Sequence, residues 1–188
     1  MASRRVISVL SLLLCLMFMA SDSTLYGASA LSSMDETIPL ILEVPKGNEA
    51  QQVLFATGAQ MYTYNGTAWI NNNVSADLYN FKGLKVGHHF FLGEKDVNGG
   101  QPSWETFHPY TRFTGKVVET VHQQNDSIPW VLLQATTNIG KKKFIGASTF
   151  IQRIYTHGGL APCAEYPAEE GAVFKSNYTT LYQFWAAT

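Results

Sequence analysis

Short runs of β-branched and aromatic residues recur along this chain, and turns rich in glycine and asparagine separate them. Such runs, bounded by turn residues, are typical of strands, because a helix instead repeats its apolar residues about every three or four positions. The pattern predicts an all-β fold: a single-domain antiparallel sandwich or barrel with at most one short helix. The expected strands include Val53–Phe55, Gln60–Tyr64, Phe90–Leu92, Phe113–Val121, Trp130–Leu133 and Thr149–Tyr155.

One segment fits a helix better than a strand. Val74, Leu78 and Phe81 stand at helical spacing within Val74–Phe81. This spacing predicts a helix of a turn or two at that place.

The start of the domain is marked by prolines. Residues 31–48, which include Pro39 and Pro45, are expected to form an N-terminal lead-in with one edge strand, Leu40–Val44. No domain linker, internal repeat or low-complexity tract follows. Residues 40–188 are therefore predicted to form a single β-rich domain.

The first thirty residues have the organisation of a secretory signal. Arg4 and Arg5 precede the apolar stretch Val6–Ala20, and Ala28–Ala30 offers a small-residue cleavage site. The stretch is shorter than the roughly 20 residues that span a bilayer, so a cleaved signal is favoured over an uncleaved anchor. Residues 1–30 are predicted to be a signal peptide, and the mature protein to be secreted, extracellular or in the cell wall, without a membrane span.

Secretion also explains four acceptor sequons for N-glycosylation. Their asparagines are Asn65, Asn73, Asn125 and Asn177. The number exceeds chance, which favours a secreted eukaryotic glycoprotein, and each sequon predicts local exposure because the transferase must reach the asparagine.

The mature chain is expected to fold without a disulfide. Cys15 leaves with the signal, and Cys163 then has no partner in the same chain. Three states of Cys163 stay open: a buried thiol, an intermolecular bridge and a nucleophile.

Charge argues against a nucleic-acid partner. The net charge is −1, only 14% of residues are charged, and the longest run of like charge is Lys141–Lys143. Binding to a phosphate backbone needs a basic surface that this composition does not supply. The sequence does not settle the oligomeric state.

A series of short blocks occurs in an order typical of one family. The blocks are Gly58–Tyr62, Ala76–Tyr79, Val86–His89, Pro102–Glu105, Gly115–Val117, Ile128–Leu133, Ile151–Ile154, Gly158–Cys163 and Tyr182–Phe184. In these blocks the chain resembles the DUF 3455 family, a domain of unknown function found in bacteria, fungi and plants. The resemblance covers about residues 40–185 and implies kinship rather than a particular chemistry.

The chain departs from this family in two places. Many relatives have a cysteine in place of Tyr64, which implies a bridge to the counterpart of Cys163 that is impossible here. In many bacterial relatives the histidine that matches His89 is followed almost at once by the Pro-x-Trp block, whereas here Phe90–Gln101 intervenes. This insertion weakens the case for a site in which His89 lies beside Trp104.

Several chemistries lack their sequence signatures. Some fungal relatives look to have been labelled malate dehydrogenase, but no Gly-x-Gly-x-x-Gly turn occurs, so an NAD-dependent dehydrogenase is rejected. No Gly-x-Ser-x-Gly elbow supports a serine hydrolase. The adjacent His88 and His89 point to opposite faces of a strand, so no metal site is predicted. No cofactor is expected.

A cofactor-free acid/base site remains as a candidate. Glu105 follows Trp104, and a carboxylate beside an indole in a barrel mouth would be desolvated, which raises its pKa. His89 is the candidate to share the proton, and Arg153 to hold an anion.

Four further side chains are candidates for ligand binding. They are Trp104, Gln60, Tyr62 and Gln152. Each also has an ordinary structural interpretation: tryptophans are mostly core residues, and buried amides mostly satisfy backbone groups.

Two functions therefore stay open. The first is a secreted β-rich glycoprotein that binds a small molecule or carbohydrate, or has a structural role, at the cell surface or wall. The second is a small cofactor-free isomerase, cyclase or lyase with its site inside a barrel. An apolar cavity with one or two ionisable side chains would favour the enzyme, whereas a filled core would favour the binding protein.

Overall fold

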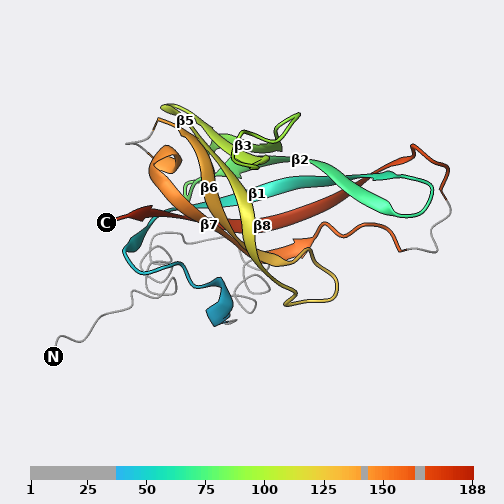
Figure 1. Ribbon diagram of the computed structural model, residues 1–188, viewed down its shortest axis with the longest axis horizontal. Coiled ribbons are helices and arrows are strands. Elements are labelled where there is room, and N and C mark those ends of the chain that lie inside the picture. The colour runs from blue at the N-terminus through green and yellow to red at the C-terminus, as the bar shows by residue number, and fades with distance from the viewer. Residues whose placement is uncertain (1–36, 141–143, 164–167) are drawn as a thin grey trace, which may run out of the picture. The chain divides into compact units, whose positions relative to one another are not determined.

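Eight antiparallel strands close into one barrel in the computed structural model, which describes residues 37–140, 144–163 and 168–188 (Figure 1). The strands are β1 (Asn48–Tyr64), β2 (Trp69–Tyr79), β3 (Lys85–Phe91), β4 (Pro102–Phe107), β5 (Tyr110–Val121), β6 (Trp130–Ile139), β7 (Ser148–Gly158) and β8 (Val173–Ala187). Each strand pairs with its neighbour in the sequence. The predicted all-β fold is confirmed, and of the two architectures offered it is the barrel.

The barrel closes where the first strand pairs with the last. β1 and β8 are antiparallel from Asn48 opposite Ala187 to Thr63 opposite Val173, and Figure 1 shows them side by side. Closure gives every strand two hydrogen-bonded neighbours, so the sheet has no free edge.

One apolar core fills the inside of the barrel. Alternate residues along the strands point inward, as the two-residue period of a strand requires. The fully buried side chains include Leu54, Leu78, Trp104, Phe113, Ile151, Tyr182 and Phe184. Ile145 adds to this core from the short 3-10 helix η3 (Phe144–Ala147), which precedes β7.

A second core lies on the outer face of β1, β6, β7 and β8. Leu42 packs there with Val53, Trp130, Ile154 and Leu181. Leu42 belongs to the lead-in, so this segment covers one side of the barrel. A strand that is buried on both faces has a nearly continuous run of apolar residues, and such runs make these strands easy to recognise in the sequence.

Two local predictions are wrong. Val74–Phe81 is not helical: it lies mostly in β2, where Val74, Ala76 and Leu78 are buried at alternate positions. The helical spacing of Val74 and Leu78 equals two strand periods, so the two patterns coincide there. Leu40–Val44 is not an edge strand either, because Leu40–Leu42 form the 3-10 helix η2.

Two sequence features fall outside the described residues. The expected signal, residues 1–30, lies there, as does Cys15. Within the described part of the chain, no helix combines the length and apolarity that a bilayer crossing requires.

Candidate functional site

A small cavity opens at one end of the barrel interior. Its volume is about 80 Å³, and it is lined by His89, Phe91, Pro102, Trp104, Val117, Val131, Leu133 and Arg153. Phe91 ends β3 and Pro102 begins β4, so the cavity lies toward the end that carries the β3–β4 loop. An eight-stranded barrel has room for packed side chains or one small ligand, and this cavity is where packing is incomplete.

His89 and Trp104 form one wall of the cavity. They are register partners on β3 and β4, and their rings stack with centroids 4.1 Å apart and planes 5° apart. The intervening residues Phe90–Gln101 do not separate them, because the extra length forms a loop beyond the ends of the two strands. The expectation that this insertion weakens the pairing is therefore wrong.

The imidazole of His89 is neutral. Its ring is buried, and burial lowers the pKa from 6.5 to about 3, with the charges of Arg153 and His88 contributing in the same direction. The Nδ1 atom lies 2.8 Å from the carbonyl oxygen of Ser103. A carbonyl only accepts, so Nδ1 carries the hydrogen and Nε2 keeps a lone pair.

Arg153 provides the positive charge at the cavity. Its Nε and Nη2 atoms donate to the carbonyl oxygen of Pro129 at 3.2 and 2.8 Å. Within the ranges that the structure describes, no carboxylate lies at ion-pair distance from it. Burial raises the pKa values of Tyr62, Tyr178 and Tyr182, and the charge of Arg153 offsets part of that rise. For His89 the charge acts in the same direction as burial and lowers the pKa further.

Two buried tyrosines lie close to this arginine. The hydroxyls of Tyr178 and Tyr182 are 3.2 Å apart, and Tyr182 is the register partner of Arg153. Burial raises the pKa of both phenols, so both are protonated at neutral pH. The two residues are four positions apart on one strand, and this even spacing was the sequence signal for a shared face.

Glu105 lies on the other face of the sheet. Its neighbour Trp104 points inward, so Glu105 points outward, between His88 and Arg112 on the adjacent strands. The hydroxyl of Tyr110 donates to its carboxylate at 3.4 Å. Of the three predicted catalytic residues, the structure brings His89 and Arg153 to one cavity and leaves Glu105 outside it.

The predicted ligand-binding residues are divided among three places. Trp104 lines the cavity. Gln60 and Tyr62 are buried inside the barrel, where Gln60 accepts from Asn71 at 2.7 Å and the Tyr62 hydroxyl donates to the carbonyl of Gly159 at 2.6 Å. Gln152 lies in the outer core.

Both ends of the Gln152 amide are used by the scaffold. Its Nε2 donates to the carbonyl of Leu42 at 2.7 Å, and its Oε1 accepts from the indole of Trp185 at 2.8 Å. These bonds attach the lead-in to β7 and engage both the nitrogen and the oxygen of the amide. The ordinary structural interpretation fits Gln152 better than a binding role does.

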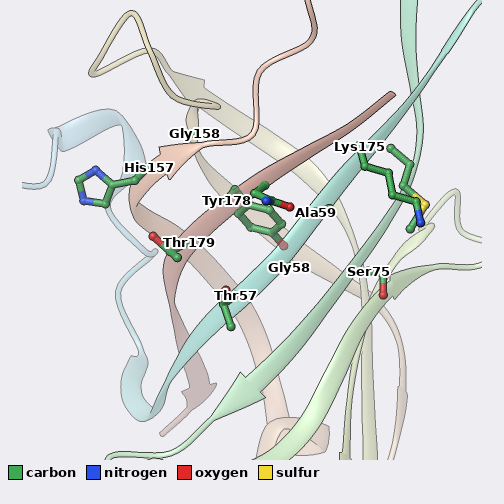
Figure 2. A pocket seen from close by; sticks show the side chains of 11 residues that line it. Thr57, Gly58, Ala59, Ser75, His157, Gly158, Lys175, Tyr178 and Thr179 are labelled. Carbon is green, nitrogen blue, oxygen red and sulfur yellow. The ribbon is translucent and has the colours of Figure 1, made fainter. Parts of the chain in front are cut away.

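A larger hollow of about 730 Å³ lies over β1, β2 and β8 and is open to solvent. Thr57, Ala59 and Ser75 contribute small side chains to its floor, and Figure 2 shows His157 and Lys175 at its opposite ends. The sequon residue Asn177 also lines it. Breadth and openness make this hollow a surface feature rather than an enclosed site.

The other candidate groups lie at the surface. The four sequon asparagines are all exposed, and so is Cys163. Among the described residues, no cluster of His, Cys, Asp and Glu has the geometry to hold a metal ion.

Comparison with known proteins gives the family. The model of the family described as "Protein of unknown function (DUF3455)" matches residues 45–186. The chain belongs to this family. No match was found among the curated proteins, nor among the solved structures. The DUF3455 match covers the whole barrel except its last residue, Ala187, and includes every residue of the cavity.

Several residues of this DUF3455 cavity have no sequence feature that marks them as part of a site. Phe91, Val117, Val131 and Leu133 form its apolar wall. They look like ordinary core residues in the sequence, because nothing local distinguishes an inward residue that borders a void from one that is packed.

Proposed function

We propose that this chain is a secreted glycoprotein of the cell surface or wall that binds a small molecule in the cavity at the end of its barrel. The observation that carries the proposal is Arg153, a cation that lines an otherwise apolar cavity without a carboxylate partner among the described residues. Arg153 is partly buried, so its charge loses part of its solvation. The Pro129 carbonyl compensates some of this cost, and a bound anion would compensate more.

The cavity meets the criterion given above for an enzyme, because it is largely apolar and contains the ionisable side chains of His89 and Arg153. Its described lining nevertheless holds no proton-transfer pair, and this favours binding over catalysis. No aspartate or glutamate is buried in the described ranges. His89 has a pKa of about 3, which makes its imidazole a weak base. The two phenols near Arg153 hold their protons at neutral pH. The interior is therefore better suited to hold a molecule than to move its protons.

The exposure of the sequons supports the glycoprotein part of the proposal. Asn65 lies in the turn between β1 and β2, and Asn125 in the loop between β5 and β6. Asn73 and Asn177 lie on strands with exposed side chains. A transferase acts on such accessible asparagines in the secretory pathway.

The test uses three probes that share the same alkyl tail and differ in their head group: hexanoate, hexanol and hexylamine. Calorimetric titration of the secreted protein is expected to detect binding of at least one of them. Val117→Trp, which fills the cavity entrance, is expected to abolish it. Val118→Trp is the matched control, because Val118 is exposed and does not line the cavity. The proposal would be contradicted if the unmodified protein bound none of the probes, or if Val117→Trp and Val118→Trp bound them equally well.

A further inference from the structure

The cavity has a polar end and an apolar wall. Among the described residues, Arg153 is the only charged side chain that lines it, because the neighbouring imidazole of His89 is neutral. Phe91, Val131 and Leu133 are among the residues that make the rest of the lining apolar. A ligand that satisfies both parts needs a negative head group and a hydrocarbon tail.

The guanidinium of Arg153 has more hydrogen-bond donors than the carbonyl of Pro129 engages. A guanidinium carries five N–H groups in a planar fork. The carbonyl of Pro129 engages Nε and Nη2 and fixes the plane of the fork. Three N–H groups remain without an acceptor in hydrogen-bond geometry among the described residues, although the guanidinium approaches the Tyr182 hydroxyl closely enough to act on its pKa. A planar carboxylate is the acceptor that matches such a fork.

Trp104 supplies a second donor with no acceptor of its own. Its side chain is 1% exposed, and its Nε1–H has no hydrogen-bond partner in the described part of the chain. The indole acts on the pKa of Tyr182, but the approach of Nε1 to that hydroxyl falls short of hydrogen-bond geometry. A buried donor without an acceptor costs free energy, so a ligand oxygen here would satisfy it.

Size and charge restrict the ligand further. A cavity of about 150 Å³ holds one benzene molecule, and this one measures about 80 Å³, so it has room for a head group and a few methylenes rather than a ring. One cation balances one negative charge. A phosphate monoester carries nearly two negative charges at neutral pH. The single charge of Arg153 would therefore offset a smaller part of its desolvation free energy.

We propose that the cavity binds the carboxylate of an aliphatic carboxylic acid, held by Arg153 and the Trp104 indole, with its hydrocarbon tail along Val117 toward solvent. This inference rests on the proposed binding function and names the class of its ligand. His89 stays neutral beside the carboxylate and limits the site to a single charge.

The same three probes, with hexyl phosphate added, test the head group. Hexanoate is expected to bind about tenfold or more tightly than hexanol and hexylamine, since charge-assisted hydrogen bonds are roughly twice as strong as neutral ones. Arg153→Gln is expected to remove this preference, and Arg153→Lys to restore part of it, because lysine keeps the charge without the fork. Arg112→Gln is the matched control, because Arg112 lies between the buried Thr111 and Phe113 and faces outward.

Each outcome decides between the two proposals. Equal binding of hexanol and hexanoate, lost in Val117→Trp, would overturn the carboxylate and leave the binding function standing. Tighter binding of hexyl phosphate would replace the carboxylate by a phosphate. Binding of none of the probes would overturn the binding function as well. A preference for hexanoate that survives Arg153→Gln and Arg153→Lys would overturn the role of Arg153.

Discussion

The imidazole of His89 lies flat on the indole of Trp104, with 4.1 Å between the ring centroids. The stack excludes water from one face of the imidazole, and Tyr182 meets both rings edge-on. A ring enclosed in this way resists protonation, which links the stack to the stability of the fold.

The first prediction concerns pH. The pKa of His89 falls from 6.5 to about 3 on folding, so between these values the unfolded chain binds more protons than the folded one. The free energy of unfolding should therefore fall as the pH drops from 6.5 toward 3, by up to ~1.4 kcal/mol per pH unit from this residue. Urea denaturation at several pH values measures the slope.

A pair of variants separates His89 from the other acid-sensitive groups. His89→Phe should flatten the slope, whereas His122→Phe, at an exposed position, should leave it unchanged. Equal slopes for wild type and His89→Phe would show that the imidazole does not control acid stability.

The second prediction concerns Glu105. Because its carboxylate faces outward, Glu105→Gln should change the free energy of unfolding by less than about 0.5 kcal/mol and leave hexanoate affinity unchanged. Trp104→Ala, one residue earlier, should cost about 3–5 kcal/mol because it empties a buried site. Thermal unfolding and calorimetry measure both effects. A large loss of binding in Glu105→Gln would restore the carboxylate as a site residue.

Alternation along strands explains this separation of neighbours. Glu105 and Trp104 are adjacent in the sequence, but a strand sends successive side chains to opposite faces. The hypothesis drawn from the sequence placed the Glu105 carboxylate beside the Trp104 indole inside the barrel. Adjacent residues of a strand point to opposite faces, so the two side chains cannot both point inward. The inward direction of Arg153 follows from the same parity, because Ile151 is buried in the same core.

The sequence predicted the strands better than it predicted how the barrel closes. Turn residues and β-branched runs were enough to predict an all-β domain, and the blocks that contain Trp130 and Arg153 pointed to the family. Pairing of Asn48 with Ala187 is long-range, and no local pattern reports it. The pairing of His89 with Trp104 could not be predicted for the same reason. The length of the loop between two strands does not determine which of their residues lie opposite each other.

The third prediction concerns Gly58, which lies between Ala76 and Tyr178 on the neighbouring strands. A Cβ atom there would overlap the carbonyl oxygen of Ser75 and the Cα of Ala76. Gly58→Ala should therefore destabilise the fold by about 1–3 kcal/mol through overpacking. Gly93→Ala is the control, since a Cβ at Gly93 meets no atom within 4 Å. Equal denaturation midpoints for the two variants would refute this account.

The fourth prediction concerns the attachment of the lead-in. Gln152→Ala leaves the carbonyl of Leu42 and the indole of Trp185 without partners, which should cost about 1–3 kcal/mol. Limited proteolysis should then cut near Leu42 faster than in wild type. Gln134→Ala, at an exposed position of β6, should change neither the stability nor the cleavage rate. Unchanged cleavage in Gln152→Ala would show that apolar packing alone holds the segment.

The fifth prediction concerns maturation. Protein recovered from the medium of a eukaryotic host should begin near Leu31 and carry N-glycans on at least two of the four sequons, because all four asparagines are exposed. Intact mass before and after glycosidase treatment measures both. A product that retains Met1, or a mass that the enzyme does not change, would contradict the secretory assignment.

The pairing of the first strand with the last also determines when this chain can fold. Until β8 has been synthesised, β1 and β7 each present an unpaired edge, and such edges recruit other chains. A barrel closed by its termini has a high contact order, so closure comes late and slowly. The chain therefore stays open as it leaves the ribosome. A premature stop before Val173 would yield an aggregating sheet rather than a smaller barrel.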